Sequence, residues 1–264
     1  MPPTTCPDGS HAHLSTRQLY SEGETDFRVC PACGLAFREQ FPGHDELDAI
    51  YAEAYRVDAI EHNATNQEST DFATETYGRF VTERFTRPDM TVFDFGAATG
   101  ALVERLRSQG LRAEGFEFSA SARAHARAAR RLDLMGSLDS IPAGAYDLVT
   151  MIEVIEHLTD LQGTLRKLRA ALKPGGRLLV TTPSRTSWRA RLEGGHWREA
   201  TKKFHLFLFD DASLRHHLLT AGFVAPLRVR FSPVLRPGLK SQLIVRGTQA
   251  LGLGGTLCMS VRRD

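Results

Sequence analysis

The sequence predicts an α/β protein built on a doubly wound sheet, and three observations support this. Apolar segments of strand length alternate with amphipathic helical segments from residue 91 onward. The first of these strands runs into a turn of small residues at 96–100, which opens a helix. The 264 residues suffice for one large core with an appendage, but not for two full-sized domains. We therefore expect one main domain preceded by a smaller segment.

The elements follow in a definite order along the chain. Apolar residues recur at helical spacing over 45–56 and again over 69–87, where Pro88 ends the pattern, and the polar stretch 61–68 between them predicts a flexible link or lid. Strands are expected at 91–95 and 113–118, at 226–230 and at 255–261, and a helix over 211–223. The boundaries that we expect are 1–44 for a cysteine-containing segment, 45–88 for helices and a lid, 89–264 for the main domain and, within it, 183–209 for a substrate cap.

The composition limits where the protein acts. No run of eighteen apolar residues occurs, and the first residues have neither the basic nor the apolar region of a secretion signal. Four cysteines are too few for a disulfide framework. We therefore expect a cytoplasmic protein without a membrane partner.

The net charge of +2 hides an asymmetry between the two parts of the chain. The first 160 residues hold 14 Lys and Arg against 26 Asp and Glu, a balance of −12, and the remaining 104 hold 19 against 5, a balance of +14. Either the two surfaces complement one another, or the basic part attracts an anionic ligand. No lysine-rich tail accompanies it, so nucleic-acid binding is permitted but not favoured.

Three of the four cysteines lie within the first 33 residues, which suggests a metal site. Cys30 and Cys33 form a C-x2-C knuckle followed by glycine, and Cys6 resembles half of a second knuckle. His11 or His13 could supply a fourth ligand. The pattern predicts a structural Zn²⁺ site made of Cys6, one of these histidines, Cys30 and Cys33, the alternative being ordinary cysteines.

The turn after the first strand is suited to a charged small ligand. Asp94 closes the strand and can reach a cationic group, while the free amides at the start of the next helix favour a carboxylate or phosphate. Glu117 ends the second strand 21 residues after Gly96, the distance at which a doubly wound fold places a carboxylate on a ribose diol. The alternative for Glu117 is a solvated acid at a strand end.

Two downstream motifs make a family resemblance specific. The sequence EVIEHL at 153–158 follows one strand, and LKPGG at 172–176 precedes the next. Together with the turn at 94–100, they resemble the class I S-adenosylmethionine (SAM)-dependent methyltransferases over residues 90–262. The resemblance implies a seven-stranded, Rossmann-like sheet. The departure is Ala98, which stands where the common motif has a middle glycine.

The resemblance also implies which residues bind the cofactor SAM. Gly96, Ala97 and Gly100 would surround its methionine end, and Asp94 would lie near its ammonium group. The other residues of the expected cofactor site are Glu117 for the ribose, Phe118 and Ser137 with Leu138 for the adenine, and Met151.

The N-terminal part resembles a subset of these enzymes from bacterial secondary-metabolite and polysaccharide pathways. The matching features are the CxxCGLxF knuckle at 30–37 and a helix that carries Tyr51 and Tyr55. The second cysteine of the upstream knuckle is missing, which bears on zinc binding more than on methyl transfer.

The catalytic residues are expected in and after the EVIEHL motif. Methyl transfer requires alignment of the reactants and, for a hydroxyl acceptor, removal of a proton. Glu153 and His157 would share one face if this segment is helical, and His205 lies in the expected cap. In one reading, a histidine is the general base; in another, these residues and Glu156 bind Mg²⁺ or another divalent cation, as in the small-RNA and quinone-pathway enzymes that the motif resembles; in the third, they organise the loop.

The predicted function is methyl transfer to a small, anionic acceptor in a biosynthetic pathway, with oxygen favoured by the histidines. The cap holds two tryptophans and several cations, which suit such an acceptor but also suit a surface insertion with its tryptophans packed inward. The rival functions are an RNA or tRNA methyltransferase with a metal-assisted site and a catalytically silent scaffold. A nicotinamide-dependent dehydrogenase leaves both downstream motifs unexplained. The oligomeric state is not determined by the sequence.

Overall fold

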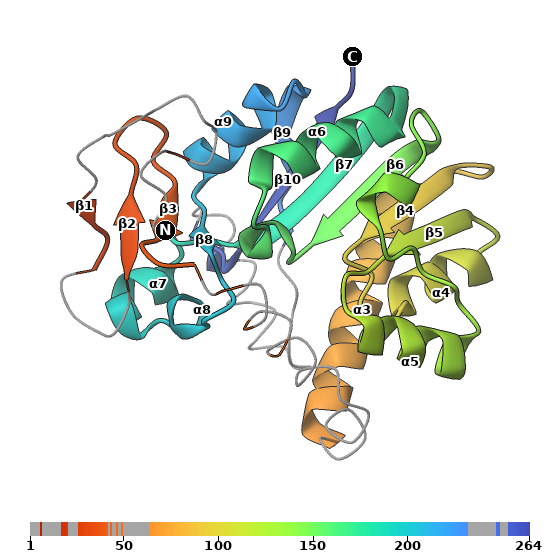
Figure 1. Cartoon of the computed structure of the whole chain (residues 1–264), viewed down its shortest axis with the longest axis horizontal. Coiled ribbons are helices and arrows are strands. Elements are labelled where there is room, and N and C mark those ends of the chain that lie inside the picture. Colours follow the sequence, from red (N-terminus) through yellow and green to blue (C-terminus); the bar gives the residue numbers. More distant parts are fainter. Residues whose placement is uncertain are drawn as a thin grey trace.

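The computed structural model describes residues 6, 17–20, 26–41, 43, 46, 49, 64–231, 247–248 and 253–264. In these residues the chain forms two sheets, a small one near the N-terminus and a large one that carries most of the helices (Figure 1). The predicted helix at 45–56, with Tyr51 and Tyr55, lies outside the described residues apart from single positions.

The large sheet has the strand order β5-β4-β6-β7-β10-β9. Its first four strands are parallel, and β10 runs antiparallel to both β7 and β9. The bounds are Thr91–Phe95 for β4, Arg112–Phe116 for β5, Tyr146–Ile152 for β6, Leu172–Pro183 for β7, Val224–Arg228 for β9 and Thr256–Arg262 for β10. The α/β fold and the strands expected at these places are therefore confirmed.

Helices cover both faces of the large sheet, because its strands carry apolar side chains on both faces. Phe93 and Val149 belong to the core shared with α6 and α9, while their neighbours Val92 and Leu148 belong to the core shared with α3, α4 and α5. The bounds are Ala64–Phe85 for α3, Ala101–Ser108 for α4, Ala120–Arg130 for α5, Leu161–Ala171 for α6 and Asp211–Thr220 for α9.

The prediction of seven strands is not confirmed in the described part of the chain, where the large sheet has six. Next to β5, a single parallel bridge joins Phe116 to Met135, and the amide of Met135 donates to the carbonyl of Gly115 at 2.9 Å. The chain leaves this edge at once, because Ser137 caps the short 3-10 helix η1 (Leu138–Ser140). Too few residues are available here for a continuous strand.

The small sheet combines the N-terminal segment with the expected cap. Its order is β1-β2-β3-β8, with bounds Arg17–Gln18, Phe27–Val29, Ala36–Arg38 and Phe207–Leu208. The core beneath it contains Phe27 and Val29 from the segment and Trp197 and Ala200 from the cap. The short helices of the cap are α7 (Trp188–Glu193), η3 (Gly194–His196) and α8 (Arg198–Thr201). We call this unit, residues 26–41 and 184–209, the small lobe.

Two local expectations need correction. The link predicted at 61–68 is helical from Ala64 onward, because α3 starts there and continues to Phe85. The EVIEHL motif is not an α-helix that places Glu153 and His157 on one face: Glu153 has a positive φ of 53°, and only Ile155–His157 form the 3-10 helix η2. No helix among the described residues is long and apolar enough to cross a membrane.

Candidate functional site

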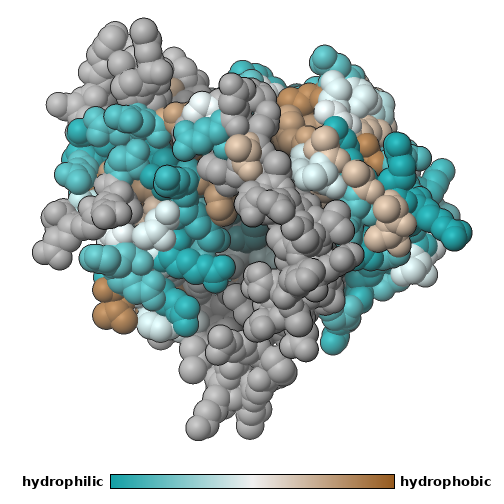
Figure 2. Space-filling view, turned by 60° about the horizontal axis from the view of Figure 1, so that its bottom comes forward, coloured by the Kyte–Doolittle hydropathy of each residue, from teal (hydrophilic) through white to brown (hydrophobic). Residues whose placement is uncertain are grey.

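The candidate site lies at the carboxyl edge of β4, β5 and β6, where a doubly wound sheet offers its ligand crevice. Asp94 is the penultimate residue of β4, Glu117 follows β5, and Glu153 follows β6. Parallel pairing brings these strand ends together. Figure 2 views the molecule from the side toward which this edge points in Figure 1 and shows hydrophilic surface on the left of a central hollow.

Asp94 is buried and held in place for a charged partner. Its Oδ1 accepts a hydrogen bond from Oγ1 of Thr150 at 2.7 Å, and the residue is 4% exposed. Burial raises the pKa of Asp94 to about 7, with a further upward contribution from the negative charge of Glu117. A buried carboxyl with this pKa gains from an incoming cation, which suits the expected contact with an ammonium group.

The turn after β4 requires small residues for reasons that the structure makes visible. Gly96 has a φ of +83°, and a Cβ placed on it would lie 2.4 Å from Cγ2 of Val154. The amides of Gly96 and Ala97 both donate to the carbonyl of Phe116. Ala98 adopts a left-handed φ of +49°, which costs a non-glycine residue about 1 kcal/mol and explains why a glycine is common there. Gly100, with a φ of +80°, is the N-cap of α4.

Glu117 is fixed by the backbone of the same turn. Its Oε2 accepts from the amide of Ala98 at 2.9 Å and its Oε1 from the amide of Ser119 at 2.8 Å. Burial raises the pKa of Glu117, and these hydrogen bonds oppose that shift. The next residue, Phe118, is 56% exposed although it is large and apolar. An exposed ring beside a fixed carboxylate suits the adenine and ribose that the sequence analysis assigns to this pair.

The remaining cofactor residues of the prediction differ in how accessible they are. Ser137 and Leu138 lie at the start of η1, next to the bridge residue Met135, and therefore near the end of β5. Met151 is fully buried in the core shared with α6 and α9.

Glu153 is held in its strained conformation from two sides. Its amide donates to the carbonyl of Thr181 at 3.0 Å, and its Oε1 accepts from the hydroxyl of Tyr77 in α3 at 3.1 Å. Burial raises the pKa of Glu153 to about 7. A positive φ in a non-glycine residue persists only where its surroundings impose it, and such residues concentrate at functional sites.

The structure brings the two predicted histidines together. The ring centroids of His157 and His205 are 4.8 Å apart, and ligand atoms of Glu156, His157 and His205 all lie within 4.8 Å of one another. Nδ1 of His157 is 2.9 Å from the carbonyl oxygen of Phe204. We call Glu156, His157 and His205 the histidine cluster. Because 47 residues separate the histidine ring from Phe204, tertiary structure alone creates this arrangement.

Burial keeps both histidines neutral. It is the largest cause that lowers the pKa of His157 to about 4 and that of His205 to about 2. Burial also raises the pKa of Glu156 well above its usual range. The side chain of His157 is 18% exposed and that of His205 2%, so His157 is the member better placed to reach a bound acceptor.

The small lobe positions His205 through a buried arginine that the sequence analysis did not single out. Arg38 of β3 is 8% exposed; its Nε donates to the carbonyl of His205 at 2.9 Å, and its Nη2 donates to the carbonyl of Lys202 at 2.8 Å. Asp26 pairs with the same guanidinium. In the sequence, the only signal for this role was a charged residue directly after the apolar residues 35–37. The burial of all three positions of β3 is known only from the structure.

Two polar atoms of the histidine cluster lack hydrogen-bond partners among the described residues. They are Oε1 of Glu156 and Nδ1 of His205, while Oε2 of Glu156 accepts from Thr182 at 2.9 Å. Buried groups without partners are costly and therefore indicate an unfilled role. One carboxylate and two neutral imidazoles are suitable ligands for a divalent cation, so the residues fit the cation that the resemblance implies.

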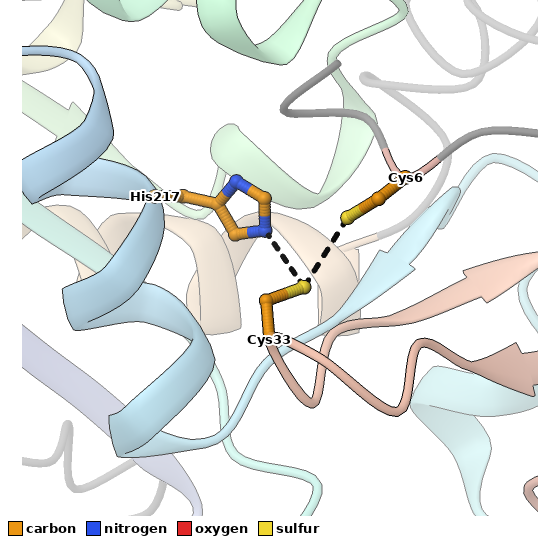
Figure 3. Close-up of side chains that lie close together, drawn as sticks. All are labelled: Cys6, Cys33 and His217. Carbon is orange, nitrogen blue, oxygen red and sulfur yellow. Dashed lines mark hydrogen bonds between the residues drawn. The ribbon is translucent and has the colours of Figure 1, made fainter. Parts of the chain in front are cut away.

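A second cluster gathers the cysteines of the predicted zinc site, with an unexpected partner. Sγ of Cys6 lies 3.2 Å from Sγ of Cys33, which lies 3.6 Å from Nε2 of His217 in α9 (Figure 3). Cys30 is buried nearby but is not among these closely spaced atoms. The contacts with Cys6 and His217 lower the pKa of Cys33 to about 4.

The predicted ligands His11 and His13 lie outside the described residues. His217 was missed because it comes from the far end of the chain. It occupies an inward position of α9 together with Leu214 and Leu218, and a histidine in such an apolar stripe was the available signal.

Comparison with protein families decides the identity of the main domain. The model of a methyltransferase-domain family matches residues 69–225, more than half of the chain and the whole carboxyl edge described above. The chain belongs to this methyltransferase family. Its enzyme class, a SAM-dependent methyltransferase, and the cofactor SAM follow from this membership.

Curated relatives of this methyltransferase carry one recurring name. The ubiquinone biosynthesis O-methyltransferase of Sodalis glossinidius is 28% identical over 165 residues, which cover 53% of this chain and 66% of the relative. That of a Bradyrhizobium strain is 32% identical over 110 residues, covering 38% and 42%. The chain thus spans slightly less than two thirds of one relative and under half of the other.

Solved structures confirm the fold of the methyltransferase domain. The methyltransferase in the Haloferax volcanii complex with the Trm112 methyltransferase activator has a TM-score of 0.61 at 19% identity, covering 84% of this chain and all of the other. A SAM-dependent methyltransferase from Archaeoglobus fulgidus has a TM-score of 0.55 at 14% identity, covering 76% of this chain and all of the other. At these identities, the likeness concerns the fold alone.

Proposed function

We propose that this methyltransferase transfers the methyl group of SAM to a hydroxyl oxygen of a small, anionic acceptor in a biosynthetic pathway. The observation that carries the proposal is the histidine cluster, which two separate parts of the chain assemble beside the expected cofactor edge. The names of the curated relatives support transfer to oxygen.

The proposed reaction is an in-line displacement. The acceptor oxygen forms a bond to the methyl carbon as the carbon–sulfur bond breaks, so that the sulfonium becomes the neutral thioether of S-adenosylhomocysteine. The hydroxyl proton passes to Nε2 of His157. In the tautomer with the proton on Nδ1, this N–H donates to the carbonyl of Phe204 and the lone pair lies on Nε2. Burial keeps His157 neutral and so leaves it able to accept this proton, but the same lowering of its pKa makes it a weaker base than an exposed histidine.

In the alternative mechanism, the same residues would bind a divalent cation. Glu156, His157 and His205 would hold it, with Glu153 as a neighbouring carboxylate, and the cation would lower the pKa of the acceptor hydroxyl. The unpartnered atoms Oε1 of Glu156 and Nδ1 of His205 favour this form.

The charge of the acceptor is inferred from the basic C-terminal part of the chain, which includes the cap. Lys202 acts electrostatically on Glu153, Glu156 and both histidines, and its Nζ pairs with Glu199 at the same place. Of the two cap tryptophans, Trp197 is packed inward, while Trp188 remains 37% exposed. Because Lys202 is already paired with Glu199, an anionic acceptor would have to compete for it, and the support for an anion rests on the basic balance of residues 161–264.

The zinc ion predicted for the N-terminal cysteines is proposed as a structural component outside the reaction. The remaining functional assignments, including cofactor contacts of Phe118, Ser137 and Leu138, are part of the same proposal.

The first experiment measures thermal stabilisation by SAM, S-adenosylhomocysteine and NADH, because a ligand of the native state raises the unfolding midpoint. We expect a shift with the first two ligands alone. Release of S-adenosylhomocysteine is then measured with phenols that carry a carboxylate, with their uncharged analogues, with primary amines and with an RNA oligonucleotide. Turnover of amines or RNA without turnover of any phenol would contradict the proposal.

The chelator EDTA separates the two forms of the proposal. If His157 acts as the base, Mg²⁺ and Mn²⁺ do not change the rate after EDTA treatment, and any loss caused by removal of the structural zinc is restored by Zn²⁺ alone. If the cluster binds a cation, the rate falls and Mg²⁺ or Mn²⁺ restores it. A scaffold without catalytic function would bind SAM but release no S-adenosylhomocysteine with any acceptor.

A further inference from the structure

The cysteine–histidine cluster is more than a set of cysteines that happen to be buried. Cys6 is 5% exposed, Cys33 7% and His217 0%, and their ligand atoms all lie within 4.8 Å of one another. Figure 3 shows the three side chains pointing toward one another from three separate places: the N-terminal segment, the turn between β2 and β3, and helix α9. This convergence has the form of a ligand set.

The Cys33–His217 distance matches that of a tetrahedral zinc site, whereas the Cys6–Cys33 distance is about 0.6 Å shorter. With Zn–S bonds of about 2.3 Å and Zn–N bonds of about 2.0–2.1 Å, two thiolates lie about 3.8 Å apart and a thiolate and an imidazole nitrogen about 3.6 Å apart. The structure has 3.2 Å between Cys6 and Cys33, and 3.6 Å between Cys33 and His217. The sulfur separation is much longer than the roughly 2.05 Å of a disulfide bond, and neither cysteine forms a disulfide.

The turn that carries Cys33 supplies a fourth candidate ligand. Cys30 precedes Cys33 by three residues and is 2% exposed. Its carbonyl accepts from the amide of Gly34 at 2.9 Å, and Gly34 has a φ of +75°, which gives the chain the tight bend of a C-x2-C knuckle. Cys30 belongs to the same large buried core as Cys6 and Cys33, and its Sγ would have to move closer to join the three atoms that lie within 4.8 Å of one another.

The imidazole of His217 is oriented from its other side. Nε2 of Gln162, in α6, lies 3.1 Å from Nδ1 of His217 and donates to the carbonyl of the same residue at 3.2 Å. Gln162 is itself 3% exposed, and its Oε1 has no hydrogen-bond partner in the described part of the chain. Zinc binding through Nε2 requires the ring proton on Nδ1, so the Gln162 amide would turn to present Oε1 as its acceptor, the arrangement common for metal-binding histidines.

We propose that Cys6, Cys30, Cys33 and His217 bind one structural zinc ion, which fastens the small lobe to helix α9 of the methyltransferase domain. Binding converts the cysteine thiols to thiolates and releases their protons. Four protein ligands leave no position for a substrate, so the ion has no part in methyl transfer. By holding the turn between β2 and β3 against α9, it would fix the lobe that carries Arg38 and His205.

The first test uses the full-length protein and requires no acceptor. Elemental analysis should find one zinc ion per chain after purification. After removal of zinc, Co²⁺ should give the visible bands of a tetrahedral site together with thiolate-to-cobalt charge-transfer absorption, and zinc should displace it. Absence of zinc together with no cobalt spectrum would overturn the proposal, as would mass-spectrometric detection of a Cys6–Cys33 disulfide in the protein as isolated.

Variants of two neighbouring histidines test the role of His217. His217→Gln should reduce zinc affinity by at least 10-fold and lower the unfolding midpoint, whereas His216→Gln, one residue away on the same helix, should keep one zinc ion. His217→Cys should retain zinc and strengthen the charge-transfer absorption, because it replaces a nitrogen ligand by sulfur. Full zinc content and an unchanged cobalt spectrum in His217→Gln would refute the assignment even if Cys6 and the knuckle bind zinc.

If His217→Gln does not fold, a variant of Gln162, which contacts His217, provides a second test. Gln162→Ala leaves all four ligands in place and should weaken zinc binding by about 10-fold, the smaller end of the effect known for residues that orient metal ligands. Unaltered affinity in this variant and unaltered cobalt bands would show that the imidazole is not a ligand.

Discussion

The cofactor edge and the histidine cluster lie close together, yet they are built in opposite ways. At the cofactor edge, Asp94 and Glu117 come from one continuous stretch of chain and accept hydrogen bonds from Thr150, Ala98 and Ser119. The histidine cluster forms where the small lobe meets the rest of the methyltransferase domain, and two of its buried polar atoms lack partners among the described residues.

This difference indicates a division of work. A satisfied set of carboxylates and amides is preorganised to bind a ligand that is the same in every turnover. In the proposed function, the cluster with unpartnered atoms receives the acceptor proton or a cation. Because the second cluster depends on the placement of the small lobe, we expect it to be more sensitive to changes far from the site.

The largest expected effect separates catalysis from cofactor binding. His157→Ala and His205→Ala should each lower kcat/KM by about 10²–10⁴-fold, the usual contribution of a general base or its equivalent. Both should leave the thermal shift with SAM unchanged, because neither residue lies at the cofactor edge. His196→Gln, an exposed histidine of the cap, serves as the control. Equal turnover in both alanine variants and the control would remove the histidine cluster from the mechanism.

The next comparison uses two glycines with the same backbone conformation. Gly96 and Gly110 have φ values of +83° and +80°, but an added Cβ would lie 2.4 Å from Val154 at the first and meets nothing within 4 Å at the second. Gly110→Ala should lower the free energy of unfolding by about 1 kcal/mol from backbone strain alone. Gly96→Ala should cost clearly more and weaken SAM binding. Calorimetry of both variants checks this, and equal losses would show that close packing at the turn is unimportant.

A smaller effect concerns pH. Because burial raises the pKa of Asp94 to about 7, the folded state holds a proton there that the unfolded state loses near pH 4. Its contribution to stability is therefore present at low pH and lost as the pH rises toward 7. Cofactor binding should follow the opposite course, because the ammonium group of SAM requires the carboxylate.

We expect the affinity for SAM to rise about 10-fold between pH 5.5 and 7, as the ionised fraction of Asp94 increases. Titration calorimetry across this range measures it. Asp94→Asn should bind more weakly and with a flat profile. A slope that persists in this variant would assign the titration to another group.

The smallest expected effect tests the link between the lobes. Arg38→Met removes the donors to the carbonyls of His205 and Lys202, so kcat should fall several-fold with little change in SAM affinity. Arg28→Met is the matched control: Arg28 lies on the adjacent strand β2 and is paired with Glu39 on the partly exposed side. If both variants lose the same activity, the effect comes from the stability of the sheet and not from His205.

Much of the methyltransferase domain could be read from local patterns. The strand, small-residue turn and helix at 91–108 need only hydrophobic periodicity and steric room, and both are properties of neighbouring residues. The same reasoning failed at Glu153, where helical spacing suggested a helix. The residue instead has a left-handed conformation that Thr181 and Tyr77 hold in place.

The sequence by itself determined the family and the cofactor, because these depend on motifs within short stretches. The tertiary structure alone decided that β8 of the cap completes the N-terminal sheet, that Arg38 holds His205, and that His217 meets Cys33 across 184 residues. These contacts bring together residues that are far apart in the chain. Local patterns do not carry that information, because it arises only when the two lobes pack.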